Sequence, residues 1–270
     1  MKNYNFITPE VKSIGRATMD ELYRRWQFWG ILAGVIVSSI TIFILLGVRD
    51  MLFIFPFFIV IPYFILIESK IRVLFWKQFA ELNGWKYKDK SDTNQEQGIM
   101  FRQGYGRVIY HCVEGVIDDR NFRVFSYQFS FGFGKHRKIY SYAVFSFKFK
   151  GSFPHIYLNN KANSYGIKVG ESIPIPAEFE KSFSLSAPKE YEIEALEIFT
   201  PDVLASLLDN KLGHDVEFVN QEMLIFFDGQ ISDSEQLERE FKRALDLEDL
   251  LDEKLDRFKT ETIGDMPTSL

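Results

Sequence analysis

The residues with the clearest chemical potential are His111 and the adjacent Cys112, a pair that a metal site or a nucleophilic thiol would use. Consecutive residues of a strand point to opposite faces, so these two side chains do not converge. The other histidines, His136, His155 and His214, lack the short spacing of metal ligands. We therefore interpret Cys112 as a buried thiol, and we predict no catalytic residue, no metal and no cofactor.

The segment GFGKHRK, residues 132–138, clusters Lys135, His136, Arg137 and Lys138. A phosphate-binding P-loop requires GxxxxGK[ST] between a strand and a helix, whereas an alternating strand pattern follows here. The segment is therefore predicted to be the tip of a β-hairpin. Its charges allow two interpretations, a solvated turn or a contact with anionic lipid headgroups in a domain tethered beneath a membrane.

Carboxylates are abundant but fall on solvated helical faces, among them Glu238, Glu240, Asp249, Asp252 and Glu253. No apolar pocket pattern surrounds a pair of acids, so a hydrolase is not predicted. The net charge of -5 argues against nucleic acid as a partner, because phosphate binding needs a basic face. The single cysteine excludes an internal disulfide.

Two apolar runs, separated by Arg49-Asp50, dominate the N-terminal part of the sequence. The first, 26–48, has about 23 uncharged residues and forms a helix of roughly 34 Å, enough for a bilayer core of about 30 Å. The second, 51–67, has about 17 uncharged residues, the lower limit for spanning. The pattern predicts a transmembrane helical hairpin over residues 26–70.

Two other interpretations of these runs are disfavoured. A signal peptide has a shorter apolar region of about 7–15 residues followed by a cleavage site. A helical hairpin in the core of a soluble protein would show a polar face, and neither run has one.

The basic residues that flank the two runs predict their orientation. Arg24 and Arg25 precede the first run, and Lys70 and Arg72 follow the second. Because positive residues favour the cytoplasmic side, we expect both termini in the cytoplasm and a multi-pass hairpin in the inner membrane.

Composition and helix signals divide the chain into five segments. Asn83-Gly84 is a stop signal for the helix that leaves the membrane. We expect residues 1–15 to be mobile and residues 17–26 to form an interfacial helix. The segments are a cytoplasmic N-terminal tail (1–25), the transmembrane hairpin (26–70), a juxtamembrane helix (71–84), a cytoplasmic α+β domain (85–258) and a disordered tail (259–270).

The soluble domain is predicted to be α+β, with an antiparallel, aromatic-rich sheet, a helical insertion and a closing C-terminal helix. In FRVFSYQFSFG the residues of two faces alternate, which predicts one buried and one wet face. The predicted buried residues are Phe125, Tyr127, Phe129 and Phe131, and the predicted wet residues are Ser126, Gln128 and Ser130. The same alternation follows in IYSYAVFSFKFKG, and the two runs read as a hairpin joined by GFGKHRK.

The remaining elements of the domain follow from turn and capping signals. Its C-terminal helix is expected to open with a capping box from Ser232 to Glu235 and to pack one apolar stripe on the sheet. The predicted elements are strands at 98–102, 107–113, 155–158 and within 178–188, a loop at 161–177, helices at 190–199 and 200–210, a hairpin over 214–229 turning at Asn220-Gln221, and a helix over 232–258.

The run FSYQFSFGFGKHRKIYSYAVFSFKFKGSFPHIYL resembles an uncharacterised bacterial family of membrane proteins. In that family two aromatic strands pair across a GK-x-R turn, and two transmembrane helices precede a cytoplasmic domain of unknown function. ALEIFTPDVLASLLD and VEFVNQEMLIFFDG resemble its C-terminal portion. The resemblance supports the topology and implies no activity.

Three functions from different classes remain open at this point. The favoured one is a non-enzymatic, membrane-tethered module whose cytoplasmic domain binds a protein partner or associates with copies of itself. The second is a domain that senses lipid headgroups through its basic hairpin tip. The third is an enzyme that the sequence does not reveal.

Overall fold

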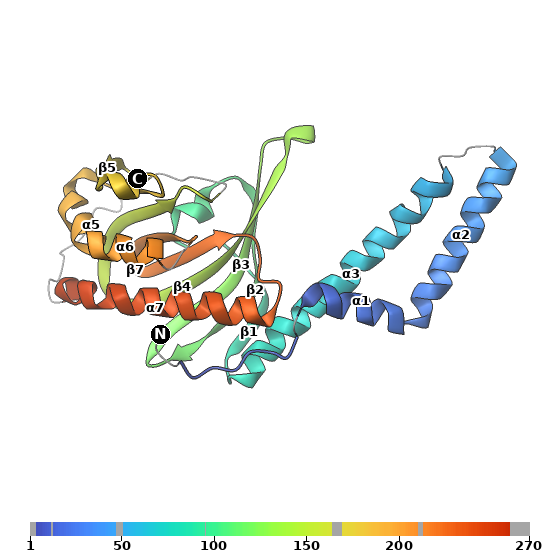
Figure 1. Ribbon diagram of the computed structural model, residues 1–270, viewed down its shortest axis with the longest axis horizontal. Helices are drawn as coiled ribbons and strands as arrows, with labels where there is room; N and C mark the ends of the chain where they lie inside the picture. Colours follow the sequence, from blue (N-terminus) through green and yellow to red (C-terminus); the bar gives the residue numbers. More distant parts are fainter. Residues whose placement is uncertain are drawn as a thin grey trace.

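A computed structural model describes residues 4–11, 13–46, 51–94, 96–163, 169–209 and 213–259 (Figure 1). It consists of a projecting pair of helices and an α+β domain. The α-helices are α1 (Ile14–Arg24), α2 (Trp26–Leu46), α3 (Met51–Leu82), α4 (Ala177–Glu180), α5 (Glu192–Ile198), α6 (Pro201–Asp209) and α7 (Ser234–Lys259). The strands are β1 (Lys86–Ser91), β2 (Tyr105–Ile117), β3 (Arg120–Phe131), β4 (Lys138–Asn160), β5 (Glu171–Ile173), β6 (Phe183–Ala187) and β7 (Asp215–Asp228). Three 3-10 turns are η1 (Ile99–Arg102), η2 (Gly134–His136) and η3 (Lys189–Tyr191).

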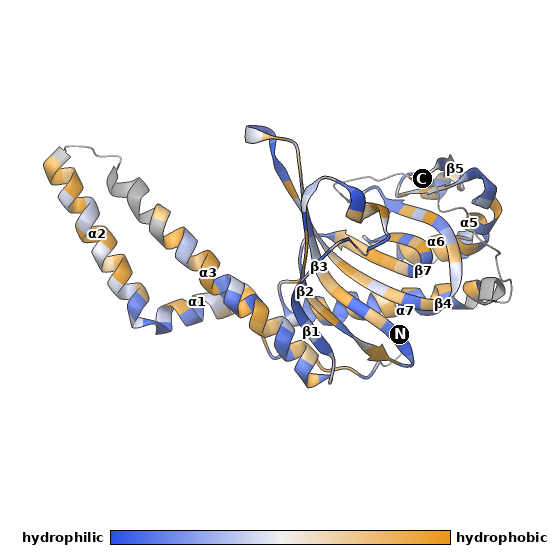
Figure 2. Cartoon of the chain, turned by 180° about the vertical axis from the view of Figure 1, so that it is seen from behind, coloured by the Kyte–Doolittle hydropathy of each residue, from blue (hydrophilic) through white to orange (hydrophobic). Residues whose placement is uncertain are grey.

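Helices α2 and α3 lie beside each other and extend away from the sheet, with apolar residues along both (Figure 2). Within the described residues, one helix, Trp26–Leu45, is long and apolar enough to cross a membrane. The second predicted span, 51–67, is not found by that criterion. The side chains at 51–57 and 59 of that span, and the predicted turn at residues 49–50, lie outside the described part.

Helix α3 runs through most of the predicted juxtamembrane segment, 71–84, to Leu82, and this end of the helix lies in the domain core. Phe75, Trp76 and Phe79 are almost completely buried there. The helix stops as the sequence predicts, because Gly84 adopts a left-handed φ of 68° and the Trp85 amide donates to the Ala80 carbonyl at 2.8 Å.

The strands form one antiparallel sheet in the order β1-β2-β3-β4-β6-β5, and β7 also pairs with β4. Strand β4 bends, with shifts of register between Lys148 and Phe153 and between Phe153 and Ile156. Its first half pairs with β3 and its end pairs with β6, while β7 follows it around the bend. The predicted β3–β4 hairpin is present.

The predicted hairpin at Asn220-Gln221 is wrong, because β7 is a single strand through this point. Asn220 has a φ of 52° and lies opposite Phe153, where β4 is also irregular. The residues that suggested a turn therefore form a bulge that lets two long strands bend together.

Both faces of the central sheet are buried, so the predicted wet face is also wrong. Helix α7 crosses one face (Figure 1), where Phe241 contacts Phe122 and Phe145. The segment that contains η1 covers the other face, where Phe101 packs on Tyr127. Under these layers the strand serines become buried, including Ser126, Ser130 and Ser146.

Several local predictions need correction. Residues 98–102 contain η1 rather than a strand, and the predicted loop at 161–177 contains β5, while its residues 164–168 lie outside the described part. The capping box of α7 is shifted by one residue, because the Gln236 amide donates to Asp233 Oδ1 and the Ser232 amide donates to Gln236 Oε1.

The N-terminal segment packs against the domain, contrary to the predicted mobile tail. Tyr4 is buried, and its hydroxyl donates to Asp246 and Asp249 of α7 at 2.9 and 2.8 Å. The backbone of Ile7 exchanges two hydrogen bonds with the Asn83 side chain, both 2.7 Å. The segment thus links α1 to the domain. The predicted C-terminal tail lies outside the described residues from position 260 onward.

Candidate functional site

Arg24 and Arg25, which were predicted to flank the first apolar run, lie where α1 meets α2. Arg24 and Arg25 both pair with Glu21, at 2.7 and 2.8 Å, and the exposed Trp26 follows them. Hydrogen bonds from the two guanidinium groups lower the pKa of Glu21, which therefore stays ionised. The junction therefore places two arginines, paired with Glu21, beside an exposed aromatic side chain.

The other two predicted flanks, Lys70 and Arg72, lie on α3 in different surroundings. Lys70 is exposed. Arg72 pairs with Glu68 at 2.8 Å and donates to the Ile231 carbonyl at 2.9 Å, just before α7. Arg72 therefore fastens α3 to the domain, a role that the sequence did not indicate because its partner is about 160 residues away.

The predicted basic tip lies at the end of a projecting β-hairpin, which we call the β3–β4 arm, residues 131–139 (Figure 1). Gly132 has a φ of 80°, and a Cβ there would lie 2.5 Å from the His136 carbonyl oxygen. The His136 amide donates to the Phe133 carbonyl at 3.1 Å. The turn therefore depends on glycine, and its backbone is closed by its own hydrogen bonds.

Side-chain contacts brace the arm near its tip. The Tyr105 ring stacks on Phe133, with centroids 5.4 Å apart and planes 9° apart. The Tyr105 hydroxyl donates to the Gly132 carbonyl at 2.6 Å, and Arg137 donates to Ser130 Oγ at 2.9 Å. The Arg137 guanidinium also lies 5.8 Å from the centre of the Tyr105 ring. These contacts fix the direction in which the tip points.

The arm presents both apolar and basic groups to its surroundings. Phe133 is 82% exposed, and Phe131 and Ile139 are more than half exposed. Lys135 and Lys138 are also exposed, as is His136 between them. The structure thus brings the predicted basic residues together and adds apolar side chains, which sequence reasoning missed because alternation assigned Phe131 to a buried face.

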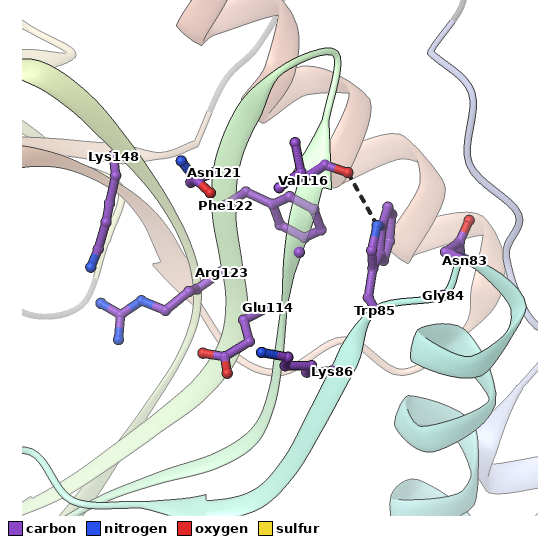
Figure 3. A pocket seen from close by; sticks show the side chains of 11 residues that line it. Asn83, Gly84, Trp85, Lys86, Glu114, Val116, Asn121, Phe122, Arg123 and Lys148 are labelled. Atoms are coloured by element: carbon purple, nitrogen blue, oxygen red, sulfur yellow. Dashed lines mark hydrogen bonds between the residues drawn. The ribbon is translucent and has the colours of Figure 1, made fainter.

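A cleft of about 560 Å³ lies between the end of α3 and the β1–β3 edge of the sheet (Figure 3). Trp85 and Phe122 form its apolar wall, and the Trp85 indole N–H donates to the Val116 carbonyl at 3.2 Å. Gly115 is required there, because a Cβ would lie 2.3 Å from the indole ring. Lys86 and Lys148 lie on the polar side.

The arginine of this cleft, Arg123, is already paired. It binds Glu96 through two bonds of 2.7 Å and Glu222 at 2.6 Å, and Glu222 also accepts from Ser146. Burial alone would lower the pKa of Arg123, but the two carboxylates raise it above its usual value. The cleft therefore has less positive character than its residue types indicate.

A second polar cluster is buried inside the domain around Asp215. One carboxylate oxygen accepts from the Asn160 amide at 2.6 Å and from Asn163 at 2.8 Å, and the other accepts from the Tyr157 hydroxyl at 2.7 Å. Burial nevertheless raises the pKa of Asp215 to about 7. These partners lie at or beside the C-terminal end of β4, so the cluster fixes that end of the sheet.

The interpretation of Cys112 as a buried thiol is confirmed. Cys112 is buried, and burial raises its pKa to about 11, so the thiol stays protonated and unreactive. His111 is buried too, which lowers its pKa to about 4, and it shares a 3.1 Å hydrogen bond with Tyr87. Among the residues that the structure describes, no three His, Cys, Asp or Glu side chains are placed to hold a metal ion.

The fold and the site define an α+β domain joined to a projecting helical pair.

Neither the comparison with protein-family models nor that with curated proteins finds a match, so the resemblance to a bacterial membrane-protein family stays a prediction. Among solved structures, the crystal structure of the mycobacterial trehalose monomycolate transport factor A, TtfA, is similar at 12% identity and a TM-score of 0.47. The alignment covers 67% of this chain and 92% of that one. A likeness at this TM-score carries no argument about function.

Proposed function

We propose that this chain is a non-enzymatic, membrane-anchored module. Helix α2 and the first half of α3 form a transmembrane hairpin, and the α+β domain lies on the cytoplasmic side, where it binds a protein partner or a second copy. The observation that carries the proposal is the exposure of large apolar side chains along both helices of the pair, whereas the α+β domain buries most of its aromatic residues.

Exposed apolar side chains occur along both helices of the pair. On α3, Phe58 and Leu66 are 73% and 61% exposed, and on α2, Val37, Ile44 and Leu45 are similarly exposed. A surface of this kind is unfavourable in water and marks a site of contact with a membrane or a partner. Helix α2 also has the length that a bilayer requires.

The polar side chains of α2 are satisfied within the helix, as a lipid environment demands. Ser38 and Ser39 donate to the Val35 carbonyl at 2.9 and 2.8 Å, and Thr41 donates to the Val37 carbonyl at 2.9 Å. None of these hydroxyls needs water, because each bonds one turn back along its own helix.

The cytoplasmic end of the hairpin is marked by aromatic and basic residues together. Tyr23, Trp26 and Trp29 are all exposed near the start of α2, beside Arg24 and Arg25. Aromatic side chains of this type are enriched at the membrane interface, and arginine favours the cytoplasmic side. This supports an orientation with the domain in the cytoplasm.

The ionisable side chains of the domain support a binding role rather than catalysis. Arg123 is engaged by Glu96 and Glu222, and Asp215 accepts from its neighbours in the sheet. A catalytic group must reach a substrate, and these groups are directed at one another.

The first test is extraction of the full chain from membranes. After treatment with alkaline carbonate, we expect the protein to stay in the vesicle pellet and to float with lipid on a density gradient. Recovery in the supernatant would contradict the membrane anchor.

The second test addresses the binding role. We expect crosslinking of the detergent-solubilised chain to yield a stoichiometric partner or a defined homo-oligomer. A chain that remains monomeric and without a partner would count against this role while leaving the anchor intact.

A further inference from the structure

We propose that the β3–β4 arm is a second membrane contact, in which Phe131 and Phe133 enter the bilayer interface while Lys135 and Lys138 bind anionic lipid headgroups. The proposal rests on the membrane anchor proposed above, because the anchor brings the arm to the bilayer. It adds a specific lipid-binding site to a domain that would otherwise only be tethered.

The arm extends toward the side on which the helical pair lies. It rises from the sheet, and the far ends of α2 and α3 rise in the same direction, in the two opposite views of Figures 1 and 2. Helix α7 lies below both, and the end of the domain that carries β5 and α5 lies farther from the helical pair than the arm does (Figure 1). A membrane that surrounds the helical pair is therefore approached by the arm before other parts of the domain.

The chemistry of the tip suits a membrane interface. The Phe133 side chain is 82% exposed, although the domain buries most of its phenylalanines outside the arm. Exposed aromatic side chains next to lysines are typical of segments that lie in the headgroup region. A simply solvated turn would not require two exposed phenylalanines and the half-exposed Ile139.

The lysines of the arm supply the electrostatic part of the contact, and the phenylalanines supply the apolar part. Lys135 and Lys138 are attracted to an anionic leaflet, and this attraction is screened by salt. Arg137 differs from them, because its guanidinium donates to Ser130 and lies over Tyr105, so it braces the tip. Stable membrane contact usually takes two signals, and the arm supplies an apolar and an electrostatic one.

The bracing of the arm favours binding because little order has to be imposed on contact. Tyr105 holds Phe133 by stacking and holds Gly132 by a hydrogen bond. A preorganised tip loses less conformational entropy when it enters the interface than a mobile loop would.

The test uses a fluorescent probe at the tip of the full chain. The only cysteine, Cys112, is buried, so a cysteine introduced by His136→Cys can be labelled with an environment-sensitive dye while both lysines and both phenylalanines stay in place. Ile193→Cys is the matched control, because Ile193 is 72% exposed on α5, at the far end of the domain from the helical pair (Figure 1).

Measurements are made on protein that floats with vesicles after carbonate treatment, so that a failure of the anchor is recognised separately. In vesicles of phosphatidylglycerol and phosphatidylcholine we expect the dye at position 136 to shift to the blue and to be quenched by brominated lipid. The dye at position 193 is expected to show neither effect. An unshifted, unquenched dye at position 136 in anchored protein would overturn the proposal.

Variants in the labelled background separate the two parts of the contact. Phe131→Ser with Phe133→Ser is expected to abolish the quenching, and Lys135→Glu with Lys138→Glu to abolish it in the anionic vesicles. The charge-matched control, Lys181→Glu with Lys189→Glu, changes exposed residues elsewhere and should leave the quenching intact. A blue shift that persists in detergent would indicate a protein contact. Quenching that survives both arm variants would show that these four side chains do not place the tip in lipid, and either result would contradict the proposed site.

Discussion

The two halves of α3 both carry large apolar side chains, but these lie in opposite surroundings. In the first half, Ile61, Ile65 and Leu66 are at least half exposed. In the second half, Phe75 and Phe79 are at most 1% exposed, against the sheet and α7. One continuous helix thus passes from an exposed apolar surface to an apolar surface that the domain covers.

The difference also explains how the domain is held relative to the helical pair. Helix α3 enters the core directly, Arg72 ties it to the Ile231 carbonyl, and the N-terminal segment joins α1 to α7 through Tyr4. Both helices of the pair are therefore connected to the domain by ordered contacts, which favours a fixed orientation at the membrane.

The largest effect is expected in the protein-covered half of α3. Phe79→Ala removes a fully buried ring that packs on Phe6, Trp85 and Phe241, and should cost about 3–5 kcal/mol of the unfolding free energy of the domain. The measurement is chemical denaturation in detergent. Ile65→Ala, in the exposed half, should change that free energy little, and equal costs would remove the distinction between the halves.

A charged substitution on the exposed surface of the helical pair tests the exposed side of this comparison. Val37→Arg on α2 should disfavour membrane insertion by about 2.5–3.5 kcal/mol while leaving the domain folded. The fraction of glycosylated or inserted chain in an insertion assay measures this change. Val37→Leu is the size-matched control, and an unchanged inserted fraction for the arginine variant would show that lipid does not contact this face.

A pH dependence is expected only in the water-facing domain. The folded-state pKa of Asp215 is raised to about 7 from 3.8, so the folded state binds more protons than the unfolded state between these values. His111, whose folded-state pKa is lowered to about 4 from 6.5, contributes a rise in unfolding free energy with pH between those values. Asp215 should contribute a fall in unfolding free energy as pH rises through its own window, by up to about 1.4 kcal/mol per pH unit. Asp215→Asn should remove this slope, since the amide oxygen keeps the bonds from Asn160 and Asn163 and the amide nitrogen can donate to Tyr157. Identical slopes for both proteins would contradict the assignment.

The smallest effect is expected at the junction where α3 ends. Gly84→Ala forces a Cβ into the left-handed region and should cost about 1–2 kcal/mol of unfolding free energy. Gly30→Ala, inside α2 with nothing within 4 Å, is the control and should not destabilise the domain. A loss of the same size at both glycines would mean that the helix stop is not the cause.

Elements set by local signals could be predicted from the sequence. The end of α3 at Asn83-Gly84 and the start of α6 at Pro201 follow from capping preferences that act within one turn. The β3–β4 pairing follows from alternation and a glycine-rich turn.

Elements that depend on distant contacts could not be predicted. Ser126 and Ser146 are buried because layers from elsewhere in the sequence cover both sheet faces. Asn220 forms a bulge rather than a turn because β4 bends at the residue that it faces. The basic residues of the arm were found from composition, but its exposed phenylalanines required knowledge of where the sheet ends.

The most direct test of the central claim is the sidedness of two single cysteines in intact cells. Asp50→Cys lies between α2 and α3 in the sequence, and Ile193→Cys lies on the domain, where the Ile193 side chain is 72% exposed. A membrane-impermeant maleimide applied from outside should label position 50 in intact cells and position 193 only after lysis. Labelling of both positions only after lysis would contradict a hairpin that crosses the membrane.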